Sequence, residues 1–129
     1  MNLASYIRDM QFYAHIAHNV LGGQTFFQDH AFLGDLYGTY EDAYDSVVER
    51  MIGLEEPINL VKIHEDAVKD LEEPSSYNEA FKELLKCEED LCKKIETIAP
   101  KVSQGTMQML GTIADESEVR QYKLKQRLK

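Results

Sequence analysis

Long stretches of this chain lack the residues that end a helix, and this constrains its fold more than any other feature. Proline stands at only three of 129 positions, Pro57, Pro74 and Pro100, and glycine at seven. These two residues interrupt helices most strongly, so their scarcity leaves long segments in which a helix can continue. The chain therefore has room for several long helices.

Apolar residues between these breaks recur with the spacing of a helix rather than with the alternation of a strand. The spacing predicts four helices, over about residues 3–21, 25–53, 75–100 and 104–128. The second and third are about 20 residues apart, and within this connection INLVKIHEDAV, residues 58–68, has its own helical period. With 43% hydrophobic residues, the chain can form one domain over residues 1–129. The sequence thus predicts an all-α fold, a four-helix bundle with a short helix in the long crossover.

Hydropathy, cysteine content and charge exclude several classes of protein. No run of eighteen apolar residues is present, and MNLASYIRDM lacks the pattern of a secretory leader, so we expect a cytoplasmic protein. Cys87 and Cys92 are five positions apart and point to different sides of a helix, so we expect reduced thiols. A formal net charge of −9 opposes generic nucleic-acid binding and favours the collection of cations.

The segment over 25–53 carries a polar flank beside its apolar stripe. At about 100° per residue, His30, Gly34, Asp45 and Glu49 share roughly a quarter of the helix circumference, with Gly38 among them. Each glycine inside a helix costs about 1 kcal/mol relative to alanine, so the two glycines favour a close helix–helix approach; a merely softened helix is the alternative. Histidine, aspartate and glutamate together are ligand types of iron and other divalent ions.

One chain alone cannot bring both ends of this flank to a single ion. His30 and Asp45 lie roughly 22 Å apart along a helix that rises 1.5 Å per residue. Two copies packed antiparallel about a two-fold axis near Gly38 would set His30 of one subunit level with Asp45 of the other. A hairpin at the Gly-Gly pair would also bring His18 back alongside His30. The sequence therefore predicts two equivalent metal sites shared between subunits.

These residues resemble those of a known family. His18-x11-His30, followed by HAFLGDLYGTYEDAYDSVVERMIGL with Asp45-x3-Glu49-Arg50, is similar to the DNA-protection-during-starvation proteins, the Dps or mini-ferritin branch of the ferritin-like superfamily. GTMQMLGTIADESEVRQYKL resembles the last helix of that family, which also has a crossover helix. The resemblance extends across the chain.

The resemblance implies an iron-handling protein with ferroxidase activity. Members form hollow dodecamers that oxidise ferrous iron, typically with hydrogen peroxide, and store the ferric mineral inside, which protects against oxidative damage. Their ferroxidase site lies at a two-fold subunit interface. Carried over residue by residue, the resemblance implies that His18 and His30 of one subunit bind iron (Fe²⁺/Fe³⁺) together with Asp45 and Glu49 of its partner.

The sequence departs from the family pattern at three places. Gly34 stands where the family has an aspartate ligand, and Asp35 lies about 100° further round the helix. Asn19 replaces the usual tryptophan after the first histidine, and the lysine-rich N-terminal tail that binds DNA in some members is missing, so we expect weak or no DNA binding. Gly34 leaves an alternative function: a Dps-like shell with a weakened or lost ferroxidase site, binding a partner such as DNA through its basic C-terminal tail RQYKLKQRLK.

The other features have weaker signals. Phe12 and Ile16 lie on the outer face of the first helix, which favours a subunit contact over ordinary exposed residues. We expect His15 at an interface or in solvent rather than as an accessory ligand, and His64 at the surface. An acidic set on the last helix is more typical of a solvated face than of an iron-entry pore: Asp115, Glu116 and Glu118.

Overall fold

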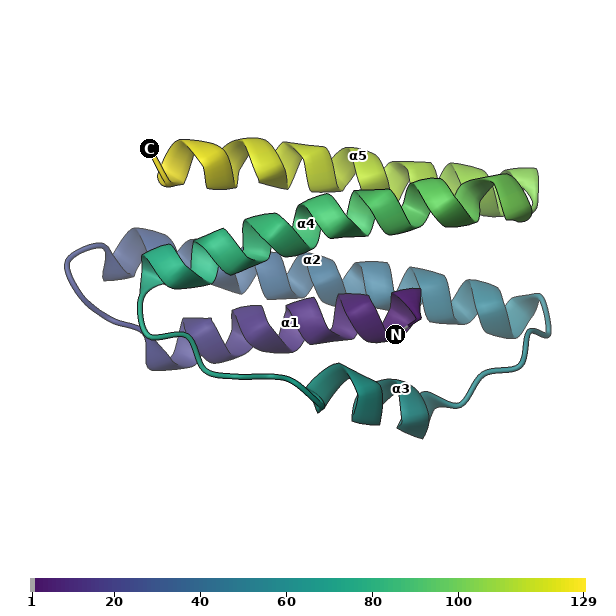
Figure 1. The fold of residues 1–129 in the computed structure, drawn as a ribbon, viewed down its shortest axis with the longest axis horizontal. Coiled ribbons are helices and arrows are strands. Elements are labelled where there is room, and N and C mark those ends of the chain that lie inside the picture. Colours follow the sequence, from purple (N-terminus) through teal and green to yellow (C-terminus); the bar gives the residue numbers. More distant parts are fainter. Residues whose placement is uncertain (1) are drawn as a thin grey trace. The chain divides into compact units, whose positions relative to one another are not determined.

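The computed structural model describes residues 2–129, and every regular element in that range is a helix (Figure 1). The elements in chain order are α1 (Leu3–Val20), α2 (Phe26–Gly53), α3 (Leu60–Val68), α4 (Tyr77–Ile98), the 3-10 helix η1 (Ala99–Lys101) and α5 (Gln104–Arg127). The four long helices and the crossover helix are confirmed, with ends about two residues or less from those predicted. Among the helices described, none combines the length and apolar character needed to cross a bilayer.

Polar side chains at the starts of the helices explain where they begin. Three helices open on a residue whose side-chain oxygen accepts a hydrogen bond from the backbone three positions on, at 2.8–3.2 Å: Asn2 before α1, Asn59 before α3 and Ser103 before α5. At the start of α4, the Glu79 carboxylate accepts hydrogen bonds from both the backbone and the hydroxyl of Ser75. These bonds satisfy amide groups that the first turn of a helix leaves without a partner.

The chain divides into two compact units, one up to Ala80 and one over Phe81–Lys129, with α4 beginning in the first and continuing through the second. In the first unit α2 and α3 both pack against α1 (Figure 1). The turn from α1 into α2 contains Gly23 at φ +123°, a conformation that other residues rarely adopt. This turn returns the chain along α1. The prediction of a single domain stays a prediction.

The crossover helix α3 covers a face of α1 that we had expected a second subunit to cover. The Phe12 ring is half-buried, with its centroid 6.1 Å from that of the His64 ring. His64 is itself half-buried: its Nδ1 donates to the Leu60 carbonyl at 2.8 Å, and its Nε2 accepts from Arg8 Nε at 3.1 Å. His64 is thus at the surface only in part, and the subunit contact predicted for Phe12 stays a prediction.

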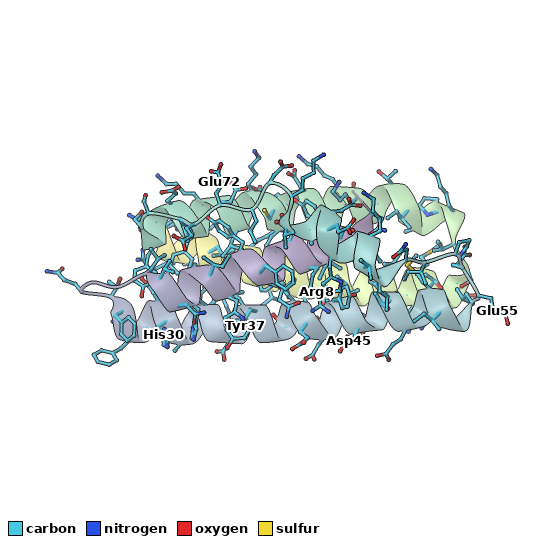
Figure 2. All side chains as sticks on the ribbon, turned by 90° about the horizontal axis from the view of Figure 1, so that it is seen from below. Arg8, His30, Tyr37, Asp45, Glu55 and Glu72 are labelled. Carbon is cyan, nitrogen blue, oxygen red and sulfur yellow. The ribbon has the colours of Figure 1, made fainter. Side chains whose placement is uncertain are left out.

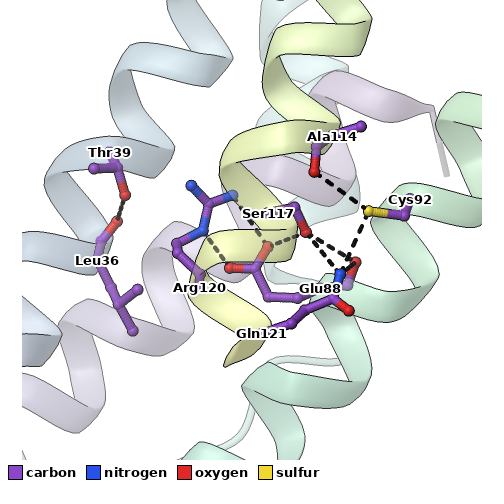
Figure 3. A network of polar contacts seen from close by, with 8 residues as sticks. All are labelled: Leu36, Thr39, Glu88, Cys92, Ala114, Ser117, Arg120 and Gln121. Carbon is purple, nitrogen blue, oxygen red and sulfur yellow. Dashed lines mark hydrogen bonds and ion pairs between the residues drawn. The ribbon is translucent and has the colours of Figure 1, made fainter. Parts of the chain in front are cut away.

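The second unit contains a buried polar network between α4 and α5 (Figure 3). Glu88 is fully buried and forms an ion pair with Arg120, whose Nη2 donates to Glu88 Oε1 at 3.1 Å. The Ser117 hydroxyl donates to the same oxygen at 2.8 Å. Gln121 Nε2 donates to Ser117 Oγ at 3.2 Å and to Cys92 Sγ at 3.4 Å. Cys87 and Cys92 are both reduced, as expected.

Candidate metal centre

Two histidines predicted as metal ligands lie together where the end of α1 meets the start of α2. The rings of His18 and His30 stack with centroids 3.6 Å apart and planes inclined by 18°. Each ring also bonds to the backbone of the other residue: His18 Nδ1 to the His30 carbonyl at 2.8 Å, and His30 Nδ1 to the His18 carbonyl at 2.9 Å. The hairpin therefore brings the two imidazoles together, as predicted.

These reciprocal bonds determine which nitrogen of each ring can bind a metal. A carbonyl oxygen only accepts hydrogen bonds, so each Nδ1 must carry the hydrogen and donate it. In the neutral imidazole the lone pair then resides on Nε2. A hydrogen bond from the second ring nitrogen to a backbone carbonyl is a common way of orienting a metal-binding histidine. Each ring thus leaves its Nε2 as a nitrogen donor of the kind that divalent transition metals bind.

Gly34 is packed against one of these imidazoles. A Cβ added at Gly34 would lie 3.3 Å from His18 Cε1 and 3.5 Å from His18 Nδ1. Within the chain, the absence of a side chain at this position gives the His18 ring room over α2. At Gly38, in contrast, an added Cβ would meet nothing within 4 Å. The His18 ring thus packs over Gly34 inside the subunit, while the surface at Gly38 remains open, and the close approach of two helices predicted for the glycines stays a prediction.

Aromatic rings flank the histidine pair on both sides. The Phe26 ring stacks on His30 with centroids 4.6 Å apart, and the Tyr37 ring meets His18 edge to face at 5.3 Å. Tyr37 in turn stacks on the exposed ring of His15, at 4.0 Å with planes inclined by 4°. On the helical wheel Tyr37 lies only about 20° from His30. This small angle is the sequence feature that indicates a position for Tyr37 beside the histidine pair.

The two predicted carboxylate ligands lie further along α2 and do not meet the histidines within the chain. Asp45 and Glu49 are both exposed, and Figure 2 shows Asp45 well separated along the helix from His30 and Tyr37. Throughout residues 2–129, no three histidine, cysteine, aspartate or glutamate side chains gather closely enough to hold a metal ion. A single subunit therefore offers a pair of imidazoles at one end of the flank and free carboxylates at the other.

Arg8 fixes the middle of this flank to the other helices of the first unit. Its guanidinium carbon lies 3.4 Å from the centroid of the Tyr44 ring of α2, its Nε donates to His64 of α3, and its Nη1 donates to Gln11 of α1. The same Nη1 is 3.9 Å from a carboxylate oxygen of the exposed Glu41. A cation over an aromatic face is attracted by the ring quadrupole, so Arg8 is held firmly at the edge of the polar flank.

Comparison with known families and structures agrees with this geometry. The model of the ferritin-like domain matches residues 3–129. The chain belongs to the ferritin-like family. Its predicted fold class, an all-α ferritin-like four-helix bundle with a short helix in the crossover, is confirmed. No protein with a curated description matches the sequence significantly.

Solved structures with 18–19% sequence identity show the same fold as this ferritin-like chain. Antigen TpF1 from Treponema pallidum has a TM-score of 0.80 at 19% identity, over 98% of this chain and 88% of that one. Dps from Listeria innocua, soaked with zinc, has a TM-score of 0.79 at 18% identity, over 98% and 96%. Dps from Listeria monocytogenes has a TM-score of 0.78 at 19% identity, over 99% and 94%. The likeness to Dps proteins is thus confirmed for the fold.

Proposed function

We propose that this protein is a cytoplasmic mini-ferritin, which oxidises Fe²⁺ at sites shared between two copies of the chain and retains ferric iron inside a hollow oligomer, most simply a dodecamer. The observation that carries the proposal is the pair of stacked imidazoles, His18 and His30, each with Nδ1 bonded to a carbonyl and Nε2 left for a metal. Membership of the ferritin-like family and the Dps-like fold support it. Listeria innocua Dps crystals were soaked with zinc and with cobalt, which agrees with divalent-metal binding on this fold.

The second copy supplies the carboxylates that the first cannot reach. Antiparallel packing of two α2 helices about an axis near Gly38 sets Asp45 and Glu49 of one subunit against His18 and His30 of the other. The open surface at Gly38 permits this approach, because an added Cβ there would meet nothing within 4 Å in the part of the chain that the structure describes. Each site then has two neutral nitrogen donors and two anionic oxygens, and the carboxylates compensate the extra charge as Fe²⁺ becomes Fe³⁺.

The proposed chemistry consumes hydrogen peroxide together with iron. Two Fe²⁺ ions each lose one electron, and the two electrons break the O–O bond of one hydrogen peroxide molecule. Two protons complete two water molecules, and two Fe³⁺ ions remain. Keeping the iron at protein ligands during this step limits the release of hydroxyl radicals, since both electrons reach the same peroxide molecule.

Titration with Fe²⁺ under anaerobic conditions, followed by a peroxide pulse, tests the proposal. His30→Ala and Asp45→Ala should each abolish high-affinity binding and rapid oxidation, whereas Asp42→Ala, an exposed carboxylate about 60° round α2 from Asp45, should change neither. Co-expression of the two inactive variants in equal amounts should restore about a quarter of the sites, because one subunit then contributes an intact His30 and its partner an intact Asp45. Full binding by His30→Ala would refute the proposed ligand set.

Gly34 favours one alternative, a Dps-like shell whose site has lost its activity and which binds another partner, such as DNA through the basic C-terminal tail. The same titration separates the two functions. An oligomer that assembles normally but binds no Fe²⁺ at micromolar concentration would support the shell.

A further inference from the structure

The proposed interface places a carboxylate opposite the position that lacks one. The register that sets His30 of one subunit opposite Asp45 of the other has its midpoint between Tyr37 and Gly38. Residues equally far from this midpoint face each other in antiparallel helices, so Gly34 of one subunit lies opposite Glu41 of its partner. The side chain missing at Gly34 is therefore matched by a glutamate across the interface.

Glu41 also lies on the correct side of its helix. Measured from His30 at about 100° per residue, Glu41 falls at about 20° and Asp45 at about 60°, and Gly34 falls between them at about 40°. Asp42, the next residue, falls at about 120°, outside the arc that holds His30, Gly34, Glu41 and Asp45. Glu41 thus shares the face of α2 that carries the proposed ligands.

The contacts of Glu41 leave it available to a second subunit. Its side chain is 57% exposed, and its ion pair is a long one, 3.9 Å to Arg8. Within its own chain Glu41 is eleven residues from His30, roughly 16 Å along the helix, which is too far for both to bind one ion. The anchored Arg8 holds the carboxylate near the flank without burying it, so the carboxylate can turn towards a metal.

We infer that the partner subunit's Glu41 takes the place of the carboxylate absent at Gly34 and is a further iron ligand at the shared site. This inference rests on the proposed function. A Cβ at position 34 would lie 3.3 Å from the His18 ring, so the ring would have to shift slightly to admit a side chain there, whereas a carboxylate that arrives across the interface leaves the ring in place. The site then has three anionic ligands instead of two, which strengthens the attraction for Fe²⁺ and compensates more of the charge of Fe³⁺.

Anaerobic Fe²⁺ binding by calorimetry tests the inference, with Glu41→Gln as the variant and Asp42→Asn as its control. Glu41→Gln should weaken binding about tenfold or more, since loss even of a group that only orients a ligand commonly costs that much. Asp42→Asn should leave binding unchanged, and both variants should retain the size and melting temperature of the parent. Unchanged affinity in Glu41→Gln would overturn the inference.

Mixed oligomers test whether Glu41 acts across the interface. Co-expression of Glu41→Gln with His30→Ala should restore tight binding at about a quarter of the sites, where an intact His30 faces an intact Glu41. If Glu41 acted on the histidines of its own chain, no mixed site would contain both groups, and no tight sites would return. Weakened binding in Glu41→Gln without this recovery would therefore overturn the inference.

A second variant tests whether carboxylates at positions 34 and 41 fill the same coordination position of the metal. Gly34→Asp should restore binding in the Glu41→Gln background. It should add little to the parent, where the partner subunit's Glu41 already fills this coordination position. Tighter binding by Gly34→Asp in the parent, together with no effect of Glu41→Gln, would overturn the inference while leaving the proposed function intact. Full binding by His30→Ala would instead reject the proposed function itself.

Discussion

Glu88 shows at the scale of one residue how strongly a buried charge depends on its partner. The carboxylate is fully buried between α4 and α5, and Arg120 and Ser117 satisfy its oxygens. Transfer of a carboxylate from water into a protein interior costs several kcal/mol unless a partner charge and hydrogen bonds compensate it. The ion pair thus favours the arrangement of the two helices in which the charges meet.

Removal of Arg120 alone should destabilise the protein severely. Arg120→Leu removes the cation that pairs with the buried Glu88 carboxylate, and we expect a loss of about 3–5 kcal/mol in the free energy of unfolding. Replacement of both residues by leucine should recover most of this loss, because no buried charge then remains. Urea denaturation followed by circular dichroism measures both variants, with the exposed Lys123→Leu as control. Arg120→Leu with the same stability as the parent would show that the buried Glu88 does not depend on Arg120.

At the scale of elements, Tyr77 ties the start of α4 to the turn between α1 and α2. Its ring is buried, and its hydroxyl donates to the Leu21 carbonyl at the end of α1 at 3.0 Å. Burial raises the pKa of the Tyr77 hydroxyl above its ordinary value near 10, and the negative charge of Asp29 in the first turn of α2 raises it further. Both effects oppose ionisation of the folded form, so the neutral phenol of Tyr77 makes the hydrogen bond to Leu21.

This raised pKa predicts how stability changes in alkaline solution. The folded state binds the phenolic proton more tightly than the unfolded state, so the contribution is complete below pH 10 and decreases as the pH rises through the folded pKa. We expect the urea midpoint to fall above pH 10, and to fall less steeply in Tyr77→Phe. Tyr122→Phe, at an exposed position, is the control. If the urea midpoint fell equally steeply with pH in Tyr77→Phe and in the parent, ionisation of Tyr77 would not explain the loss of stability.

At the scale of the whole molecule, the proposed two-fold contact depends on the open surface at Gly38. Gly38→Gln should prevent the two α2 helices from approaching, and so reduce both the oligomer mass and iron binding. Gly111→Gln is the matched control, because an added Cβ at Gly111 in α5 also meets nothing within 4 Å. Light scattering at micromolar concentration measures the mass. A full-size oligomer from Gly38→Gln would show that the two-fold contact lies elsewhere.

The net charge of the molecule predicts its affinity for nucleic acid. With a formal net charge of −9, we expect binding to duplex DNA weaker than about 1 µM at about 150 mM salt, because phosphate repulsion opposes association. A gel-shift titration measures this. Submicromolar binding that disappears on deletion of residues 123–129 would instead assign a DNA site to the basic C-terminal segment.

The sequence by itself determined the helices, their ends and the pairing of His18 with His30. Helical spacing and capping residues act locally, and the Gly-Gly turn reverses the chain so that α2 returns alongside α1. The carboxylates Asp45 and Glu49 stay predicted ligands, since the histidines proposed to share their ion belong to another subunit.

Only the tertiary structure decided how the helix faces are covered. The wheel identified Phe12 as lying outside the core, but which segment covers it depends on the path of the crossover, which places His64 of α3 there. The wheel likewise shows Gly34 and Tyr37 near the histidine face, but not that the His18 ring fills the space above Gly34 while Tyr37 meets its edge. A helical period encodes the direction of each side chain, whereas contacts between distant residues depend on the shapes of both partners and on the turn that joins them.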